Sequence, residues 1–98
     1  MRFEWDPEKA ASNEKLHGVT FDEAKKLFTS SADVLEIYDV EHSQTEDRFK
    51  SIGPIRRGLV LVVWTERADD LIRIVSAWWA TKSEEKLYRD FLEEHHGR

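Results

Sequence analysis

The sequence predicts an α+β domain, with two N-terminal helices, an antiparallel sheet of about four strands and a C-terminal helix. Two capping boxes, at residues 20–23 and 81–84, each precede apolar residues at helical spacing. Between them, residues 59–65 form an apolar, β-branched run that is typical of a buried central strand. A chain of 98 residues suits one domain, so we expect residues 1–98 to form a single unit.

The N-terminal part carries the signals of two consecutive helices. Asp6 is suited to cap the first helix, Pro7 fits its first position, and Gly18 favours the left-handed conformation that ends many helices. Residues 3–5, just before it, are a candidate edge strand. The second helix follows the capping box of Thr20 and Glu23. Its apolar face is formed by Phe21, Ala24, Leu27 and Phe28.

The pattern then changes from helical to extended. We expect strands at residues 34–38, 46–52, 59–65 and 71–78, with Gly53-Pro54 ending the second of them. The polar residues 68–70 predict a tight hairpin between the last two strands. The capping box of Thr81 and Glu84 opens the final helix, which we expect to fray from His95. Its apolar stripe consists of Leu87, Tyr88, Phe91 and Leu92. Helices must cover one face of the sheet, and the other can stay open.

Charge and composition limit the classes of function. The chain has 20 acidic residues against 15 Lys and Arg, a net charge of −5, and a pI near 5.3. Binding of RNA phosphates usually needs a basic surface, so an RNA-binding role requires a local basic patch. The absence of cysteine excludes disulfides, thiolate metal sites and cysteine nucleophiles. The scattered histidines have no metal-binding spacing, so we expect neither a metal nor another cofactor.

Nothing in the sequence indicates contact with a membrane. There is no basic and apolar leader, and no apolar run is long enough to cross a bilayer. We therefore expect a cytoplasmic protein.

A polar stripe lies along the first predicted helix. Lys9, Asn13 and His17 follow one another at spacings of four and therefore share one face. Helix capping explains none of the three. A solvated face is the simplest interpretation of such a stripe, and a functional surface is the alternative.

Motifs along almost the whole chain together resemble one known family. At the N-terminus they run from Phe3 to Lys9 and on to Asn13 and His17-Gly18. The central motif consists of Asp39, His42-Ser43, Glu46, Arg48 and Gly53. The later motifs are Thr65-Glu66-Arg67, Arg73 to Ala77, Ala80, Glu84 and Tyr88. In this order and at these spacings they resemble the BrnT family of bacterial toxins (the DUF497 domain). The resemblance implies a fold like that of the RelE ribonucleases, RNA cleavage, and neutralisation by BrnA, a ribbon-helix-helix antitoxin.

Cleavage of RNA without a metal ion requires three kinds of group. A base assists the 2′-hydroxyl, cations stabilise the phosphorane, and an acid protonates the leaving 5′-oxygen. The resemblance implies a site that relies mainly on Lys, Arg and Tyr. We select Glu46, Arg48, Arg67 and His17 as the catalytic candidates.

Each of these candidates also has a structural interpretation. Glu46 and Arg48 lie two apart, so on a strand they form either a surface ion pair or a phosphate site with its orienting carboxylate. Arg67 and Arg73 lie on the two strands of the hairpin, where they either clamp a phosphate or pair with nearby acidic residues. His17 either transfers a proton or caps carbonyl groups at the helix end.

Four further basic residues form the expected RNA-binding set. It consists of Lys9, Lys15, Arg57 and Arg73. Arg57 and its neighbour Arg56 form a basic spot after Pro54. The alternative interpretation of this spot is that it contributes only to solubility. His42-Ser43 ranks lower, because a local bond within a turn explains it, and Tyr88 is best explained as a core residue.

The chain departs from the family pattern at basic positions. Leu16 stands where the family usually has Lys, Trp78 and Trp79 follow Ser76-Ala77 where it usually has Arg, and Glu85 replaces another Arg. A tryptophan ring can stack on an RNA base but cannot neutralise a phosphorane. Because neighbouring strand residues point to opposite faces, we expect at most one indole in the core and the other at an interface.

The leading hypothesis is a BrnT-like toxin of a type II toxin–antitoxin pair, acting as a metal-independent RNA endonuclease. Its expected partners are RNA and a BrnA-like ribbon-helix-helix antitoxin, and a homodimer is possible without the antitoxin. The alternative is a catalytically weak or inactive BrnT-like protein that acts as a protein-binding module. The departures at Leu16, Trp78, Trp79 and Glu85 are the reason for keeping it.

Overall fold

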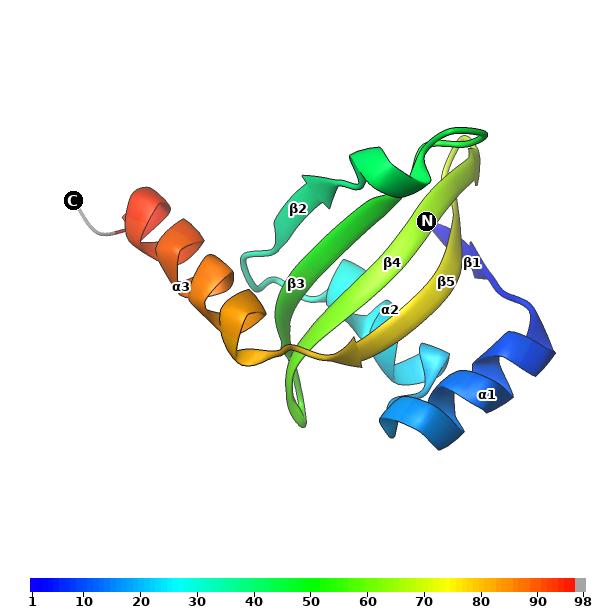
Figure 1. The fold of residues 1–98 in the computed structure, drawn as a ribbon, viewed down its shortest axis with the longest axis horizontal. Coiled ribbons are helices and arrows are strands. Elements are labelled where there is room, and N and C mark those ends of the chain that lie inside the picture. Colours follow the sequence, from blue (N-terminus) through cyan, green and yellow to red (C-terminus); the bar gives the residue numbers. More distant parts are fainter. Residues whose placement is uncertain (97–98) are drawn as a thin grey trace.

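Three helices pack around a five-stranded sheet in the computed structural model, which describes residues 1–96 (Figure 1). The elements in chain order are β1 (Arg2–Glu4), α1 (Pro7–His17), α2 (Phe21–Thr29), β2 (Leu35–Tyr38), the short 3-10 helix η1 (Val40–His42), β3 (Phe49–Ile55), β4 (Gly58–Ala68), β5 (Leu71–Trp79) and α3 (Lys82–His96). The strand order is β1-β5-β4-β3-β2, so β4 is the central strand. The predicted α+β class and the helices at both ends of the chain are confirmed.

The sheet has one more strand than the predicted four, and it is not purely antiparallel. β1 pairs in parallel with β5, with Phe3 opposite Ile72, whereas all other pairs are antiparallel. The candidate edge strand at residues 3–5 therefore exists, shifted to residues 2–4. Its pairing joins the N-terminus to a strand about 70 residues away, which no local pattern indicates.

The helix boundaries follow the capping signals. The Asp6 side chain accepts a hydrogen bond from the Glu8 N–H, and Gly18 ends α1 with φ 71°. Thr20 and Glu23 cap each other at the start of α2, and Thr81 and Glu84 do so at the start of α3. α3 is helical as far as His96, one residue beyond the expected start of fraying at His95, and the expected fraying of Gly97 and Arg98 lies outside the described residues.

The boundaries of β3 differ from the prediction. The strand begins at Phe49, not at residue 46. In the segment before Phe49, backbone groups are hydrogen-bonded to side chains instead of to a neighbouring strand. The Ser43 Oγ accepts from the Arg48 N–H, and the Thr65 Oγ1 donates to the Asp47 carbonyl. The strand also continues through Pro54 to Ile55, since β2 pairs with it only as far as Ile52 and requires no donor from the proline.

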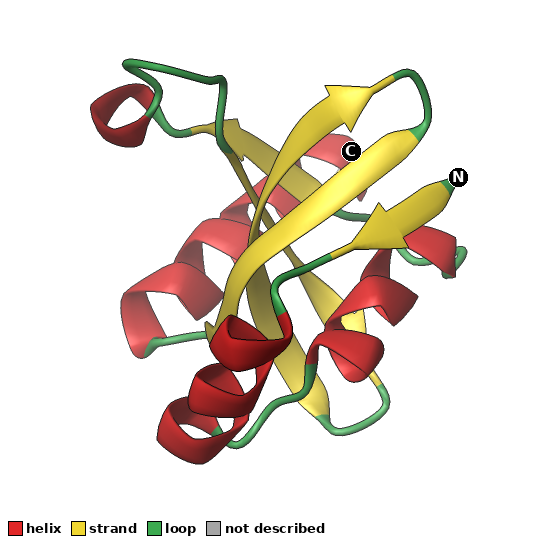
Figure 2. Ribbon diagram, turned by 90° about the vertical axis from the view of Figure 1, so that its right-hand side faces the viewer, coloured by secondary structure: helices red, strands yellow, loops and turns green. Residues whose placement is uncertain are grey.

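Helices lie on both sides of the sheet (Figure 2). On the first face, α1 and α2 cover the larger apolar cluster, to which β4 contributes Val60, Val62 and Trp64. On the second face, Leu61 and Val63 belong to a smaller cluster that packs against Tyr88 and its neighbours on α3. The buried Tyr88 hydroxyl donates to the Asp33 carbonyl at 2.7 Å. α3 covers only part of the second face, and an open depression on the rest of it is lined by both polar and apolar side chains.

Candidate functional site

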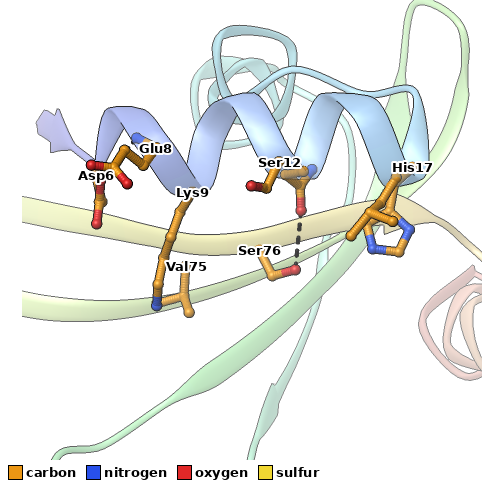
Figure 3. A pocket seen from close by; sticks show the side chains of 9 residues that line it. Asp6, Glu8, Lys9, Ser12, His17, Val75 and Ser76 are labelled. Atoms are coloured by element: carbon orange, nitrogen blue, oxygen red, sulfur yellow. Dashed lines mark hydrogen bonds between the residues drawn. The ribbon is translucent and has the colours of Figure 1, made fainter.

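Three open depressions meet along β5. The first lies between α1 and β5 and includes Lys9, His17 and Ser76 (Figure 3). The second lies at the end of α1, between Leu16 and Trp78. The third lies on the second face of the sheet and has a volume of about 180 Å³. Its lining consists of Asp39, His42, Arg48, Lys50, Val63, Val75, Ser76 and Trp78. Because His17, Val75, Ser76 and Trp78 are each shared by two depressions, we treat the three as one surface, the β5 groove.

A bulge in β5 shapes this groove. Val63 pairs with Ser76 and Trp64 pairs with Ile74, so Val75 is an extra residue on β5. Beside the bulge, Asn13 of α1 is buried and accepts hydrogen bonds from the Ser76 hydroxyl and the Ala77 N–H, both at 3.1 Å. Its amide nitrogen donates to the carbonyls of Val19 and Ala77. Asn13 is therefore not a solvated residue: its side-chain hydrogen bonds hold α1 against β5.

The other two members of the α1 stripe remain open to the groove. The Lys9 side chain extends across β5 towards Val75 (Figure 3). The His17 ring lies 6.1 Å from the Trp78 ring, centroid to centroid. The end of α1 is closed by Gly18, whose N–H donates to the Glu14 carbonyl. His17 thus stands at the junction of two depressions.

Basic side chains from β3 and the segment before it form the opposite wall. Arg48 and Lys50 are two residues apart and line the same depression. Arg48 Nη2 lies 3.9 Å from Glu46 Oε2, and Arg67 Nη1 donates to Glu46 Oε1 at 3.2 Å. Within residues 1–96 the buried Nε of Arg48 has no hydrogen-bond partner, and the Nη atoms make no hydrogen bond either. The Nη donors of Arg48 are therefore not used by the described part of the chain.

A histidine and an aspartate lie beside this wall. His42 Nδ1 is 2.9 Å and 3.1 Å from the two carboxylate oxygens of Asp39. Burial alone would raise the pKa of Asp39, but the hydrogen bond from His42 and the positive charge of Lys50 outweigh it and lower that pKa. Asp39 is consequently ionised at neutral pH, and the opposite edge of the ring remains open.

The structure brings together some of the selected residues and separates others. Lys9, His17 and Arg48 line the β5 groove, and Glu46 and Arg67 extend it. Arg73 lies opposite Thr65 and pairs with Glu4 at 2.9 Å, so Arg67 and Arg73 each have a separate carboxylate partner. Lys15 is exposed on α1 and does not line the groove.

Arg57 lies away from the groove, on the β3–β4 hairpin. Its guanidinium donates to both oxygens of Glu23 and to the Gly18 carbonyl, at 2.7 to 2.8 Å. It also lies 5.0 Å from the centre of the Trp79 ring. Hydrogen bonds from Arg57 and from the Thr20 backbone lower the pKa of Glu23 to about 2. Arg57 thus joins the hairpin to the start of α2.

Trp78 and Trp79 point to opposite faces, as predicted, but both pack against apolar clusters. Trp79 packs on the first-face cluster, and Trp78 packs on the second-face cluster and donates to Glu84 at 3.1 Å. Neither indole is fully buried, so the expectation that at most one joins the core is not contradicted; each ring is partly buried against a cluster, Trp78 because α3 covers that end of the second face. Both rings remain partly exposed beside Leu16, which is 76% exposed. An interface role for them stays a prediction.

Sequence reasoning missed Lys50 and ranked His42 low. The signal for Lys50 was its spacing of two from Arg48 on a strand, which predicts a shared face. No comparable signal existed for the contact of His42 with a buried Asp39 across the 3-10 turn.

Within residues 1–96, no group of three or more His, Cys, Asp or Glu side chains is placed to hold a metal ion. No helix among the same residues is both long enough and apolar enough to cross a membrane.

Comparison with known proteins adds two matches. A family model described as the ribonuclease toxin BrnT of a type II toxin–antitoxin system matches residues 5–84. The fold is similar to that of the Brucella abortus ribonuclease toxin BrnT, solved by crystallography at 1.1 Å resolution, with a TM-score of 0.63 and 23% sequence identity. That alignment covers 84% of this chain and 99% of the Brucella chain. No curated protein sequence matches significantly.

Proposed function

Because the chain belongs to the BrnT family of type II toxin–antitoxin systems, we propose that it is an RNA endonuclease that works without a metal ion and inhibits translation. The observation that carries the proposal is the β5 groove. In a chain of net charge −5, Arg48 and Lys50 line one depression of this groove, and Lys9 lines an adjoining depression that shares Val75 and Ser76 with it. Acidic side chains line the same depressions (Asp6, Glu8 and Asp39), so the basic patch is a local one at Arg48 and Lys50. A local patch of cations attracts a phosphate backbone even when the rest of the surface is acidic.

Arg48 and Lys50 are the residues we assign to the reacting phosphate. A guanidinium and an ammonium in one depression stabilise the charge that develops on the phosphorane oxygens. Glu46 contacts both Arg48 and Arg67, so its carboxylate orients the two guanidinium groups. Lys9 on the opposite wall, and Arg73 further along the sheet, fit contacts to neighbouring phosphates.

His17 is our candidate for one of the two proton transfers. It lies in the groove next to Trp78, where the indole offers a face on which an RNA base can stack. In this position a protonated imidazole can donate to the leaving 5′-oxygen.

The direct test is cleavage of a labelled single-stranded RNA by the purified protein in the presence of EDTA. We expect defined fragments that end in a 2′,3′-cyclic phosphate, and loss of cleavage in Arg48→Ala. Induction in cells without the antitoxin should arrest growth, and Arg67→Ala should relieve the arrest without unfolding the protein. Intact RNA together with normal growth would overturn the proposal and favour a protein-binding module.

The family also implies an antitoxin partner, and we propose a BrnA-like ribbon-helix-helix protein that docks beside Leu16, Trp78 and Trp79. These three residues form the most apolar part of the groove surface, and tryptophan is enriched at the centres of interfaces. Sedimentation with the product of the neighbouring gene should give a heteromeric complex, whereas Trp78→Ala should weaken it. Self-association of the chain alone would indicate that the same surface forms a homodimer.

A further inference from the structure

His42 and Asp39 form a pair whose geometry is not explained by turn formation alone. The Asp39 side chain is only 6% exposed, whereas that of His42 is 61% exposed. A carboxylate can only accept hydrogen bonds, so the ring nitrogen that faces it, Nδ1, carries the proton. The other nitrogen, Nε2, is then left with a free lone pair in the neutral ring.

The pair is fixed to the wall that carries Arg48. The Asp39 N–H donates to the Arg48 carbonyl at 2.8 Å, and the Ser43 hydroxyl donates to the Asp39 carbonyl at 2.6 Å. The same Ser43 oxygen accepts from the Arg48 N–H at 2.9 Å. These bonds hold the turn and the first residues of the wall as one unit, so His42 and Arg48 keep a fixed relation.

The charged groups around His42 come from two elements. Asp39, just before η1, faces Nδ1, and Arg48 and Lys50, before and on β3, line the same depression of about 180 Å³. The two cations attract the phosphate, and the general base must act next to that phosphate.

We propose that His42 is the general base of the RNA cleavage and that Asp39 is its positioning residue; the proposal rests on the proposed function. His42 Nε2 removes the proton of the 2′-hydroxyl, and the 2′-oxygen forms a bond to the adjacent phosphorus. The bond from phosphorus to the 5′-oxygen breaks, and that oxygen receives a proton from an acid, for which His17 is the candidate. The products are a 2′,3′-cyclic phosphate and a free 5′-hydroxyl, with no net oxidation and no co-reactant.

The first experiment compares His42→Gln with His95→Gln on the same RNA. We expect His42→Gln to lower the cleavage rate by about 100-fold or more and to remove the limb of the pH–rate profile that rises as an imidazole loses its proton. His95 is the matched control, because its ring bonds to the Phe91 carbonyl within its own helix, so its substitution should leave the rate unchanged.

The second experiment separates a base from an acid. Replacing the 5′-oxygen at the cleaved linkage by sulfur gives a leaving group that departs without protonation. A variant that lacks the acid should recover on this substrate, and a variant that lacks the base should not. We therefore expect His42→Gln to remain slow on the sulfur substrate. Recovery of its rate would overturn the assignment as base.

The role of Asp39 requires a readout other than activity. In Asp39→Asn the amide can donate to Nδ1, which favours the tautomer with its proton on Nε2 and removes the free lone pair. Nitrogen-15 NMR of the ring should show this change of tautomer together with the loss of cleavage at an unchanged Tm. An active Asp39→Asn variant, or one with the original tautomer, would overturn the positioning role.

The outcomes separate the two levels of the proposal. A wild-type protein that leaves both substrates intact would overturn the proposed function and the assignment with it. An active wild type together with an active His42→Gln variant would overturn the assignment only. Loss of the rising limb of the pH–rate profile in His17→Gln, with that limb kept in His42→Gln, would likewise overturn the assignment only.

Discussion

Arg57 and Arg48 both lie beside a glutamate, yet the two pairs differ in how fully they are bonded. Arg57 makes three hydrogen bonds of 2.7 to 2.8 Å and packs against an indole. In Arg48, by contrast, Nη2 lies 3.9 Å from Glu46 Oε2, and the Nη atoms make no shorter bond within residues 1–96. A guanidinium that uses its donors within the protein stabilises the fold, whereas one that retains donors in a groove can bind an external anion.

The difference separates two residues that the sequence analysis placed at the RNA. Arg48 was expected to be catalytic because it lies two residues from Glu46, and Arg57 was expected to bind RNA as part of a basic spot after Pro54. Only the folded chain shows that Arg57 meets the start of α2, 34 residues earlier in the sequence. Substitutions of the two arginines should therefore affect different properties.

The largest effect is expected for Arg48→Ala. Removal of one donor to a developing oxyanion typically lowers turnover by about 10²–10³-fold, and we expect a loss of this size in RNA cleavage. The Tm should change little, because the Arg48 side chain makes no hydrogen bond to any residue of the described range 1–96. A folded Arg48→Ala variant with normal cleavage would show that the retained donors have no role in catalysis.

Arg57→Ala should show the opposite behaviour. It removes the three bonds that join the β3–β4 hairpin to α1 and α2, and it uncovers Trp79, so thermal unfolding should occur several degrees lower. Cleavage measured well below the Tm should be retained. Loss of cleavage in the folded variant would instead support the RNA contact predicted from the sequence.

The Glu23–Arg57 pair should also make stability depend on pH. The folded-state pKa of Glu23 is about 2 and its ordinary value is 4.5, so its contribution is fully present above pH 4.5. As the pH falls from about 4.5 towards 2, the carboxylate takes up a proton sooner in the unfolded chain, and this contribution is lost. Urea unfolding at several pH values should show a shallower acid decline in Glu23→Gln than in the wild type.

The smallest effect is expected from Lys9, which we assign to a neighbouring phosphate and not to the reacting one. Each phosphate contact to single-stranded RNA contributes about 0.7 to the slope of log affinity against log salt concentration. Lys9→Gln should reduce the slope by about that amount. Lys26→Gln should not, because Lys26 of α2 lies beside Arg57 and away from the groove. Equal slopes for the wild type and Lys9→Gln would show that the RNA backbone does not follow the groove.

The helices could be predicted well because their signals are local. Asp6, Gly18 and the two capping boxes lie within a few residues of the boundaries that they set. β1 was less certain, since its partner strand lies about 70 residues away and the three residues show no period of their own. The early start assigned to β3 was wrong because the sequence does not show that Ser43 and Thr65 satisfy the preceding backbone.

For the site, residue types were easier to predict than partners. The spacing of Lys9, Asn13 and His17 correctly indicated one face of α1. It did not indicate that Asn13 is bonded to β5 while its neighbours stay open. Partners such as Glu46 for Arg67 and Asp39 for His42 depend on loop geometry, which periodicity does not describe.

The bonds between Asn13 and β5 also have a consequence for the synthesis of the protein. Asn13 bonds to Ala77, 64 residues later, and Phe3 pairs with Ile72, so the N-terminal segment cannot complete its packing until the last strand has been synthesised. A nascent chain that ends before residue 77 lacks the β5 residues that hold Asn13, so α1 has no strand against which Lys9 and His17 can be placed. The groove can therefore be completed only when translation of the chain is nearly finished.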